Sequence, residues 1–452
     1  MKFEPELITQ TIVKPSSPTP DHLRHFSLSF LDQLCPPVYY PLTFFYQAHL
    51  DTKSSNINTP EKLFNQLERS LADVLTHFYP LAGRLKDNVF IDCNDSGIPY
   101  VQARVKCYLS HFLEESKPSE LNKLLPFELD GAHESLLGVQ FNIFDCGGIG
   151  IGVCISHKIA DASSFFTFVK TWAAATTSGS ELPEKLHPEF VSPALFPSTN
   201  ISGYNTRSSI TNQKTVGKRF VFTKASIEAL IDKHFKVNTE FDENNPNPSP
   251  VEAVSLFVWS RIVASTNPEV EPAGTGTRFY QLVHVVNFRS RMNPPLPERT
   301  FGNMQWVAAT LVPAGEQLHS AVRKVRESIN KIDNEYMKVF QEGDVFSAFK
   351  EENDKISKNG AAAAAVRFTF AGFCEFGMYE VDFGWGRPVW VGLPSVITFN
   401  NQISFCDTAS GEGIEVKVQL KEEDMAKFQE DKELLEFVIN PTFVVNNIEL
   451  CP

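Results

Sequence analysis

The residues best suited to acid–base chemistry in this chain are His157 and Asp161, which follow the glycine-rich apolar run GGIGIGVCIS at 147–156. Imidazole has the side-chain pKa nearest neutral pH, so a histidine can accept a proton and return it within one reaction. The pattern indicates that His157 is a general base. For an isolated histidine a hydrogen-bonded structural role is more common, so the interpretation depends on the elements that hold this residue.

Those elements are predicted to be a buried strand and a helix with a sharp turn between them. The run 147–156 is short, apolar and rich in glycine and β-branched residues, as buried strands are. Large apolar residues then recur at helical spacing from Phe165 to Trp172. Such a turn presents one side chain at the edge of a sheet, where catalytic groups recur. Asp161 could orient the imidazole or cap the helix, and the pattern favours the cap.

Three other functions fit this pattern less well. The glycines of 147–152 lie inside the predicted strand, whereas a dinucleotide-binding loop places them in the turn that follows. His157 and Asp161 could be two metal ligands, but no third ligand stands at a matching spacing, so no metal site is predicted. The tripeptide DFG at 382–384 also occurs in kinases, but the kinase glycine loop, strand lysine and HRD sequence are missing.

The composition is that of a packed globular protein. A chain of 452 residues exceeds the size at which one hydrophobic core keeps growing, so two domains of roughly 200 residues each are expected. The 38 phenylalanines are about twice the usual share, which favours an apolar pocket. The net charge is −13 and no long basic run occurs, so neither nucleic acid nor an anionic membrane is an expected partner.

The cysteines and the N-terminus predict a cytoplasmic protein. The eight cysteines are scattered without a C-x-x-C pair, which is typical of reduced thiols. Residues 1–20 lack the apolar stretch of a signal peptide and the arginine bias of a transit peptide, and no segment approaches the length of a membrane span.

Composition and periodicity divide the chain into an N-terminal domain at 1–195, a linker at 196–217 and a C-terminal domain at 218–452. From about 182 to 218 the sequence is rich in Pro, Ser, Thr and Asn and shows little periodicity, as linkers do. Strand-like and helix-like segments occur in both halves. They predict an α/β fold with mixed sheets.

Several of these segments carry clear signals. Helices are predicted at 60–75, 250–259 and 318–332, and strands at 147–156, 218–222, 389–393 and 414–420. The first helix has a leucine at every fourth position, and the second opens with a capping box formed by Ser249 and Glu252. The charged stretch at 342–358 is expected to be a solvated loop.

Two motifs in this order resemble the signatures of the plant BAHD acyltransferases, namely SHKIAD at 156–161 and DFGWG at 382–386. The first motif alone is weak, but the two together are specific. Further stretches extend the resemblance over nearly the whole chain, among them LDQL from Leu31, HFYPLAGRL from His77 and VNFRSRMNPPLPERTFGN at 286–303. Within the family, they are most similar to the alkaloid acetyltransferases and to enzymes that make volatile esters.

The resemblance implies both a fold and a reaction. The fold has two similarly sized domains with mixed sheets and flanking helices, as in chloramphenicol acetyltransferase, joined by a long crossover loop. A channel at their interface admits an acyl-coenzyme A from one face and a small-molecule alcohol from the other. The implied reaction is acyl-CoA-dependent O-acylation, with an acetyl group transferred to an alkaloid, terpenoid or other hydrophobic alcohol by a monomer without a bound cofactor.

The resemblance also implies roles for single residues. His157 is the base, and Asp161 turns away from it to pair with Arg289. The DFGWG motif lies away from the reaction centre and is structural. Its members are Asp382, Phe383, Gly384, Trp385 and Gly386. Where alkaloid-group relatives carry TSWCR, this chain has AGFCE at 371–375, so Phe373 is expected to replace a tryptophan in the acceptor pocket.

Two alternatives remain. A protein on the same scaffold could bind a small molecule without turning it over, but the intact SHKIAD motif argues against this. Acyl transfer could also pass through Cys154 or Ser156 as a nucleophile. In a strand these two side chains share one face, and continued alternation sends His157 to the other face. This predicts direct transfer, although a turn at His157 weakens the inference.

Overall fold

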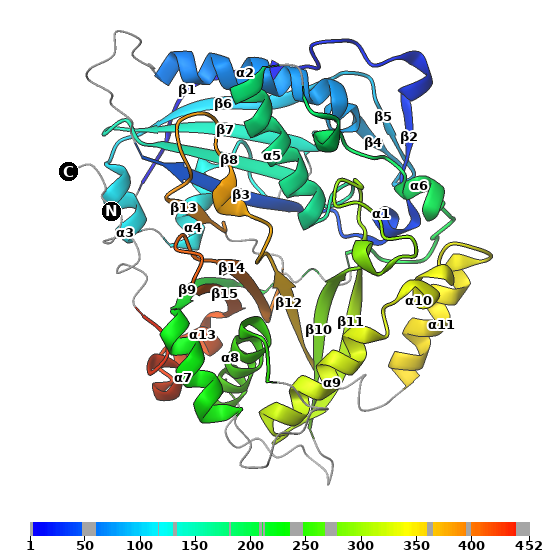
Figure 1. Ribbon diagram of the computed structural model, residues 1–452, viewed down its shortest axis with the longest axis vertical. Coiled ribbons are helices and arrows are strands. Elements are labelled where there is room, and N and C mark those ends of the chain that lie inside the picture. The colour runs from blue at the N-terminus through cyan, green and yellow to red at the C-terminus, as the bar shows by residue number, and fades with distance from the viewer. Residues whose placement is uncertain are drawn as a thin grey trace.

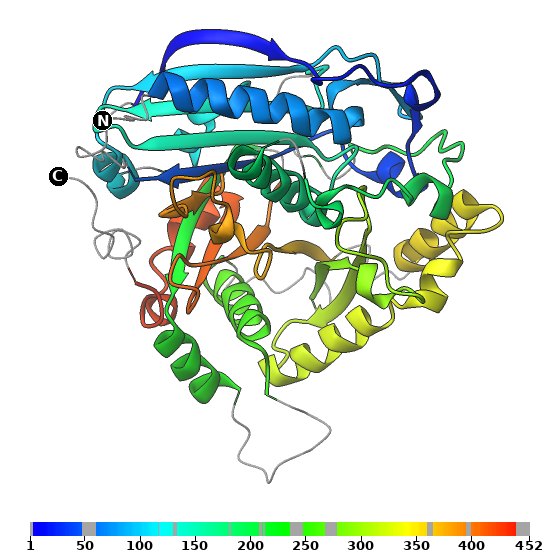
Figure 2. The same cartoon turned by 45° about the horizontal axis from the view of Figure 1, so that its top comes forward.

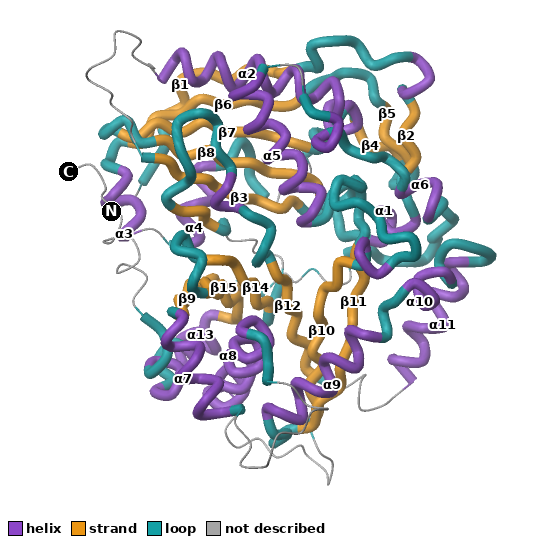
Figure 3. The backbone as a smooth tube through the Cα atoms, viewed as in Figure 1, coloured by secondary structure: helices purple, strands orange, loops and turns teal. Residues whose placement is uncertain are grey.

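Two large sheets, one in each half of the molecule, organise the fold (Figure 1). The computed structural model describes residues 3–47, 60–115, 117–129, 133–179, 182–207, 210, 213–235, 247–266, 278–358, 365–394 and 399–439. Within these residues each large sheet has six strands, and a third sheet has three. Figure 3 shows the helices packed along the faces of the paired strands.

The first sheet forms the centre of the N-terminal half. Its strand order is β1 (Glu6–Val13), β6 (Ile98–Val105), β7 (Leu137–Phe144), β8 (Ile149–Ser156), β3 (Tyr39–Tyr46) and β13 (Trp390–Gly392). Helices α2 (Pro60–His77) and α5 (Ala162–Ser178) pack on one face of it. The leucines of α2 at 63, 67, 71 and 75 are buried there, which confirms the helix that their spacing predicts.

The second sheet forms the centre of the C-terminal half. Its strand order is β11 (Gln305–Pro313), β10 (Phe279–Asn287), β12 (Val366–Gly372), β14 (Gln402–Asp407), β15 (Ile414–Lys421) and β9 (Thr215–Phe222). One face is covered by α7 (Lys224–His234), α8 (Pro250–Thr266), α9 (Leu318–Asn330) and α13 (Glu422–Phe428). The predicted capping box is present at the start of α8. The Ser249 N–H donates to the Glu252 carboxylate at 2.7 Å, and the Glu252 N–H donates to Ser249 Oγ at 3.3 Å.

The remaining described elements are short. The three-stranded sheet has the order β2 (His25–Ser27), β5 (Phe90–Asp92) and β4 (Arg84–Lys86). The short helices outside the linker are η1 (Asp21–Leu23), α1 (Phe30–Leu34), η2 (Tyr79–Ala82), α3 (Leu109–Glu115), α4 (Pro118–Leu121), η3 (Asn122–Leu124), η5 (Arg289–Arg291), α10 (Asn334–Lys338), η6 (Met378–Glu380) and α14 (Lys432–Leu435).

The segment between α5 and β9, which includes the expected linker, is mostly irregular. Its described part contains two short helical turns, η4 (Glu184–Leu186) and α6 (Ser192–Leu195). Glu189 forms an isolated bridge with Thr300, which attaches this segment to the second half. Strand β9 begins at Thr215, slightly before the expected start of the second domain.

A segment of the C-terminal half crosses to the first sheet (Figure 2). Strand β13 pairs antiparallel with β3, and Trp390, opposite Phe45, stacks on its ring with 5.3 Å between centroids. Phe383 is buried in the core of the first sheet, and the Tyr46 hydroxyl donates to the Val381 carbonyl at 2.9 Å. These large apolar side chains are buried against the first sheet. The expected C-terminal domain therefore supplies a strand to the sheet of the N-terminal domain.

The charged stretch at 342–358 is not the solvated loop that its composition predicts, and that prediction is wrong. It forms helix α11 (Val345–Lys358). The Asp344 carboxylate accepts from the Ser347 N–H at 3.1 Å and so caps the helix. Val345 and Phe346 are buried in a hydrophobic cluster with Phe30. This small apolar face, hidden among many charged residues, stabilises the helix.

Candidate active site

His157 occupies the turn between β8 and α5, as the sequence predicts. Its backbone N–H donates to the Val38 carbonyl at 2.8 Å, which continues the β3–β8 pairing by one residue. The residue is buried, with 6% of its surface exposed. A side chain at Gly152 would collide with the Leu124 carbonyl, so this glycine of β8 permits close packing.

The hydrogen bonds of the His157 ring determine its tautomer. Nδ1 lies 3.1 Å from the Ala160 carbonyl oxygen, and a carbonyl oxygen can only accept, so Nδ1 carries the proton. Nε2 of the neutral ring therefore carries no proton, and its lone pair can accept a hydrogen bond. The Tyr40 hydroxyl donates to Nε2 at 2.6 Å, and the side-chain nitrogen of Gln305 lies 3.4 Å away. Nε2 is thus the ring atom available for proton transfer.

Burial sets the charge of this site. It lowers the pKa of His157 to about 4, against the opposing effects of the Ala160 hydrogen bond and the Asp161 charge. The imidazole is therefore the neutral base at neutral pH. Burial also raises the pKa of the Tyr40 hydroxyl well above its usual range, so Tyr40 is a neutral donor.

Asp161 faces Arg289 and not the imidazole. Arg289 Nη1 donates to Asp161 Oδ2 at 2.7 Å and Nη2 donates to Oδ1 at 3.0 Å, and both residues are buried. The same carboxylate accepts from the Ser164 N–H at 2.9 Å, which caps α5, and from the Met304 N–H at 3.0 Å. Asp161 thus joins the start of α5 to the segment before β11, and helix capping and ion pairing occur together.

Two polar residues that the sequence analysis does not single out hold the backbone of His157. The side-chain amide of Asn303 donates to the His157 carbonyl and to Asp32 Oδ1, both at 2.8 Å. Asp32 is fully buried, and burial raises its pKa. Both residues lie in stretches that carry the family resemblance, LDQL from Leu31 and the segment ending at Asn303. This was the signal that could have identified them.

Cys154 and the imidazole lie on opposite faces of β8. Cys154 is packed with Tyr39 and Leu125, whereas Ile155 belongs to the core of the first sheet. Tyr40, which contacts the imidazole, is paired with Ile155 in the sheet, so the side chains of Tyr40 and Ile155 lie on the same face. Burial raises the pKa of the Cys154 thiol well above its usual value, which disfavours a thiolate. This geometry agrees with the alternation along the strand.

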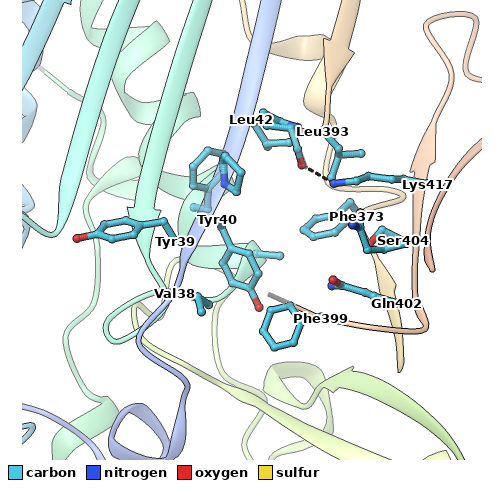
Figure 4. Close-up of a pocket in the computed structure, with 15 residues that line it drawn as sticks. Val38, Tyr39, Tyr40, Leu42, Phe373, Leu393, Phe399, Gln402, Ser404 and Lys417 are labelled. Carbon is cyan, nitrogen blue, oxygen red and sulfur yellow. Dashed lines mark hydrogen bonds between the residues drawn. The ribbon is translucent and has the colours of Figure 1, made fainter. Parts of the chain in front are cut away.

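A pocket lies between the two sheets (Figure 4), and His157 itself is not among its lining residues. Tyr40 lines it and connects it to the imidazole. One part of its wall is apolar, with Leu42, Phe165 and Phe373, and another part is polar and comes from β14 and β15. Phe373, which the family resemblance assigns to an acceptor pocket, is one of the residues that line this pocket. The full lining is Val38, Tyr39, Tyr40, Pro41, Leu42, Ala162, Phe165, Phe373, Leu393, Pro394, Phe399, Gln402, Ser404, Lys417 and Gln419.

The DFGWG motif forms a tight loop outside this pocket. Asp382 Oδ1 accepts from the Gly384 N–H at 2.7 Å and from the Gly386 N–H at 2.9 Å. Both glycines have positive φ, which other residues rarely adopt. Phe383 is buried against Trp172, and the Trp385 ring stacks on Phe383. None of the five motif residues lines the pocket.

The described part of the chain contains neither a metal site nor a membrane-spanning helix. No three His, Cys, Asp or Glu side chains there cluster as a metal site requires. No described helix is long and apolar enough to cross a membrane.

Comparison with known proteins places these features in context. Residues 3–435 match the Transferase family. The chain is 35% identical to salutaridinol 7-O-acetyltransferase of Papaver somniferum over 471 residues, which covers 94% of this chain and 96% of that protein. It is 34% identical to limonoid 7-O-acetyltransferase of Citrus sinensis over 464 residues, which covers 96% and 98%.

A solved structure is similar over the whole chain. The crystal structure of vinorine synthase superposes with a TM-score of 0.81 at 31% identity and covers 97% of this chain and 100% of that one. This confirms the expected α/β fold of two domains with mixed sheets and flanking helices.

Proposed function

The chain belongs to the BAHD transferase family and is an O-acyltransferase, and on this premise we propose that it transfers an acetyl group from acetyl-coenzyme A to a hydroxyl of a hydrophobic specialised metabolite. Relatives whose names describe O-acetyl transfer to salutaridinol and to limonoids support the acyl group and the kind of acceptor. The apolar part of the pocket, with Leu42, Phe165 and Phe373, supports a hydrophobic acceptor.

One observation carries the proposal for His157. The unprotonated Nε2 of a buried, neutral imidazole accepts a hydrogen bond at 2.6 Å from the hydroxyl of Tyr40, a residue of the pocket wall. An acceptor alcohol that takes the place of the Tyr40 hydroxyl meets the same lone pair with the same geometry. General bases need this reach of about 2.6 to 3.2 Å.

The reaction then proceeds in two proton transfers at Nε2. As Nε2 removes the proton of the acceptor hydroxyl, the oxygen attacks the thioester carbonyl and forms a tetrahedral intermediate. The carbon–sulfur bond breaks, and the protonated Nε2 returns the proton to the thiolate of coenzyme A. The products are the acetyl ester and the free thiol. Because burial lowers the pKa of His157 to about 4, the imidazolium readily gives up its proton.

Asp161 and Arg289 are positioning residues in this proposal. Their paired side chains fix the start of α5 relative to the segment before β11 and so hold the turn that carries His157. The Asp382 loop supports the first core at a distance from the chemistry. Neither group takes part in proton transfer.

The proposed enzyme acts as a cytoplasmic monomer, with acetyl-coenzyme A as a co-substrate and no permanently bound metal or cofactor. The thioester itself supplies the activated acyl group, so the chemistry needs no further electrophile. The free thiols of the cysteines in the described residues support a reducing compartment. Light scattering in solution should give the mass of one chain.

A screen of acceptors and donors tests the proposal. Alcohols of increasing bulk are combined with acetyl-CoA and with an aromatic acyl-CoA, and release of free thiol is followed. We expect the highest kcat/KM for bulky hydrophobic alcohols with acetyl-CoA. Exclusive use of highly polar acceptors such as shikimate would contradict the proposed acceptor class. Binding of acceptors without thiol release from any pair would favour the rival function, a non-catalytic binding protein.

A further inference from the structure

Strands β14 and β15 present a polar surface to the pocket, and the reaction proposed above does not use it. Gln402 lies opposite Gln419, and Ser404 lies opposite Lys417. All four side chains line the pocket. In Figure 4, Gln402, Ser404 and Lys417 lie on one side of it and Tyr40 on the other. The alternate residues of both strands are buried in the core beneath the helices of the second sheet. The polar face is therefore directed at the pocket.

Lys417 is the charged member of this polar face. Only 9% of its surface is exposed, and its ammonium donates to the Pro394 carbonyl. Among the described residues no carboxylate forms an ion pair with Lys417. An ammonium group has three N–H donors, and a buried charge without a counter-ion is costly. The side chain is therefore placed where a ligand could supply the missing negative charge.

A carboxylate on the same strand as Lys417, that of Glu415, is already paired. Arg219 on β9 is the direct partner of Lys417 on β15, so two basic side chains stand next to each other on neighbouring strands. Glu415, two residues before Lys417 on the same face, accepts from the Trp390 indole at 3.2 Å and pairs with Arg219 at 3.7 Å. This buried group thus holds two cationic side chains and one carboxylate. One further carboxylate would balance the charge of this group when Lys417 is protonated.

We propose that Lys417 binds a carboxylate group carried by one of the two substrates of this enzyme. The inference rests on the proposed function, because it identifies the pocket with the place where the substrates meet. Ser404 and Gln402 stand beside Lys417 and can donate to the same carboxylate. The apolar wall with Phe165 and Phe373 holds the carbon skeleton. The substrate class is a hydrophobic molecule with one carboxylate.

The state of Lys417 without a ligand fits this assignment. Burial lowers the pKa of its ammonium to about 7, so the group carries only part of a charge at neutral pH. A carboxylate at hydrogen-bonding distance favours the protonated form and restores the full charge.

The acetyl group of the proposed donor carries no carboxylate, so the acceptor is the expected source, and two matched pairs of substrates distinguish it from the acyl donor. The donor pair is succinyl-CoA and butyryl-CoA with benzyl alcohol as acceptor. The acceptor pair is 4-(hydroxymethyl)benzoate and its methyl ester with acetyl-CoA. We expect wild-type enzyme to prefer the carboxylate member of the acceptor pair. Lys417→Met should lower kcat/KM for that member relative to its neutral partner by about 10- to 100-fold.

Two further variants make the result specific to the charge in the pocket. Lys417→Arg keeps a cation and should retain part of the preference. Lys421→Met removes a cation from the end of the same strand, outside the pocket, and should behave as wild type. A preference for the neutral member in both pairs, or a carboxylate preference that persists in Lys417→Met, would overturn the proposal.

Two measurements separate this proposal from the proposed function and from misfolding. The probe 4-(hydroxymethyl)benzoate should raise the melting temperature of wild-type protein but not that of Lys417→Met. Such binding without turnover of any pair would count against the acyltransferase proposal and for the carboxylate site. Without ligand, Lys417→Met should melt no lower than wild type, because a buried ammonium is removed. A clearly lower melting temperature would show that Lys417 serves to hold Pro394 and would overturn the proposal.

Discussion

At the scale of single residues, burial of His157 determines how activity responds to pH. Burial lowers the pKa of the imidazole to about 4, so the base is unprotonated throughout the neutral range. We predict that, for an acceptor without a carboxylate, kcat/KM is nearly constant from about pH 6 to 8 and declines as the pH falls further, with an apparent pKa of about 4 to 5. A pH profile of thiol release measures this. A decline centred near the ordinary value of about 6.5 would contradict the burial of the free enzyme's imidazole.

The same shift makes the folded protein sensitive to acid. The unfolded histidine binds its proton with the ordinary pKa of about 6.5, so between that pH and about 4 the unfolded state holds more protons. The free energy of unfolding therefore decreases as pH falls through this window. His157→Gln should remove part of this dependence. The part due to His284, whose pKa burial also lowers to about 4, should remain.

Tyr40 competes with the acceptor for the lone pair of His157. Its hydroxyl donates a hydrogen bond to Nε2 at 2.6 Å, so the acceptor hydroxyl must displace the Tyr40 hydroxyl. We predict that Tyr40→Phe lowers the acceptor KM about fivefold, since a displaced hydrogen bond is worth about 1 kcal/mol. Steady-state kinetics with a varied acceptor measure this. A tenfold or greater loss of kcat would instead mean that the Tyr40 hydroxyl takes part in the proton transfer.

The sequence could single out His157 but not Tyr40. The histidine stands in a recognisable motif at the end of a predictable strand. The contact between Tyr40 and the imidazole depends on the register of β3 against β8, which pairs Tyr40 with Ile155. No local pattern encodes a pairing between segments so far apart in the chain. The polar face that contains Lys417 was missed for the same reason.

At the scale of secondary-structure elements, the pair formed by Asp161 and Arg289 links α5 to the segment before β11. We predict that Asp161→Ala destabilises the protein by about 3 to 5 kcal/mol, because it leaves the buried Arg289 without a counter-ion. Activity should fall with it, since the turn that holds His157 loosens. Chemical denaturation and activity assays of the same samples measure both effects.

Two variants act as controls for this prediction. Asp333→Ala removes a helix cap of similar chemistry on α10, where Asp333 accepts from the Tyr336 N–H at 2.9 Å without a buried arginine. It should cost only about 1 kcal/mol. Replacing Arg289 by Met together with Asp161→Ala should recover part of the lost stability. If Asp161→Ala keeps full stability yet loses turnover, the carboxylate acts directly in catalysis.

Elements with a strong periodic pattern could be predicted, and those with a weak one could not. Helix α2 shows its apolar stripe in the sequence because every fourth residue is leucine. Helix α11 has a short apolar face around Val345 and Phe346 within a stretch of charged residues, so its composition suggested a loop. What decides its structure is a hydrophobic cluster that includes Phe30, a contact distant in sequence.

At the scale of the whole molecule, the two halves depend on each other. Strand β13 and Phe383 come from the C-terminal half but are buried in the first sheet and its core. We predict that a fragment of residues 1–217 does not fold alone, because the edge of β3 and the site of Phe383 are left open. Circular dichroism and thermal melting of the separate fragment test this. Cooperative unfolding of residues 1–217 alone would contradict it.

The two-domain organisation could be predicted from chain length, the composition of the linker and the family resemblance. The pairing of β13 with the first sheet could not. The segment around Trp390 has the sequence pattern of an ordinary strand, and this pattern does not indicate which of the two sheets the strand joins. Its place beside Phe45 depends on which sheet offers an open edge and a fitting apolar surface, and only the folded structure shows this.

The central claim is that Nε2 of His157 moves the proton in a direct transfer of the acetyl group. The most direct test is the time course of thiol release from acetyl-CoA, with and without an acceptor, for wild type, His157→Ala and Cys154→Ala. We predict a loss of about 100- to 10,000-fold in His157→Ala and near-normal turnover in Cys154→Ala. Without acceptor no variant should release a stoichiometric burst of thiol. A burst that Cys154→Ala abolishes, or turnover of His157→Ala within tenfold of wild type, would contradict the account.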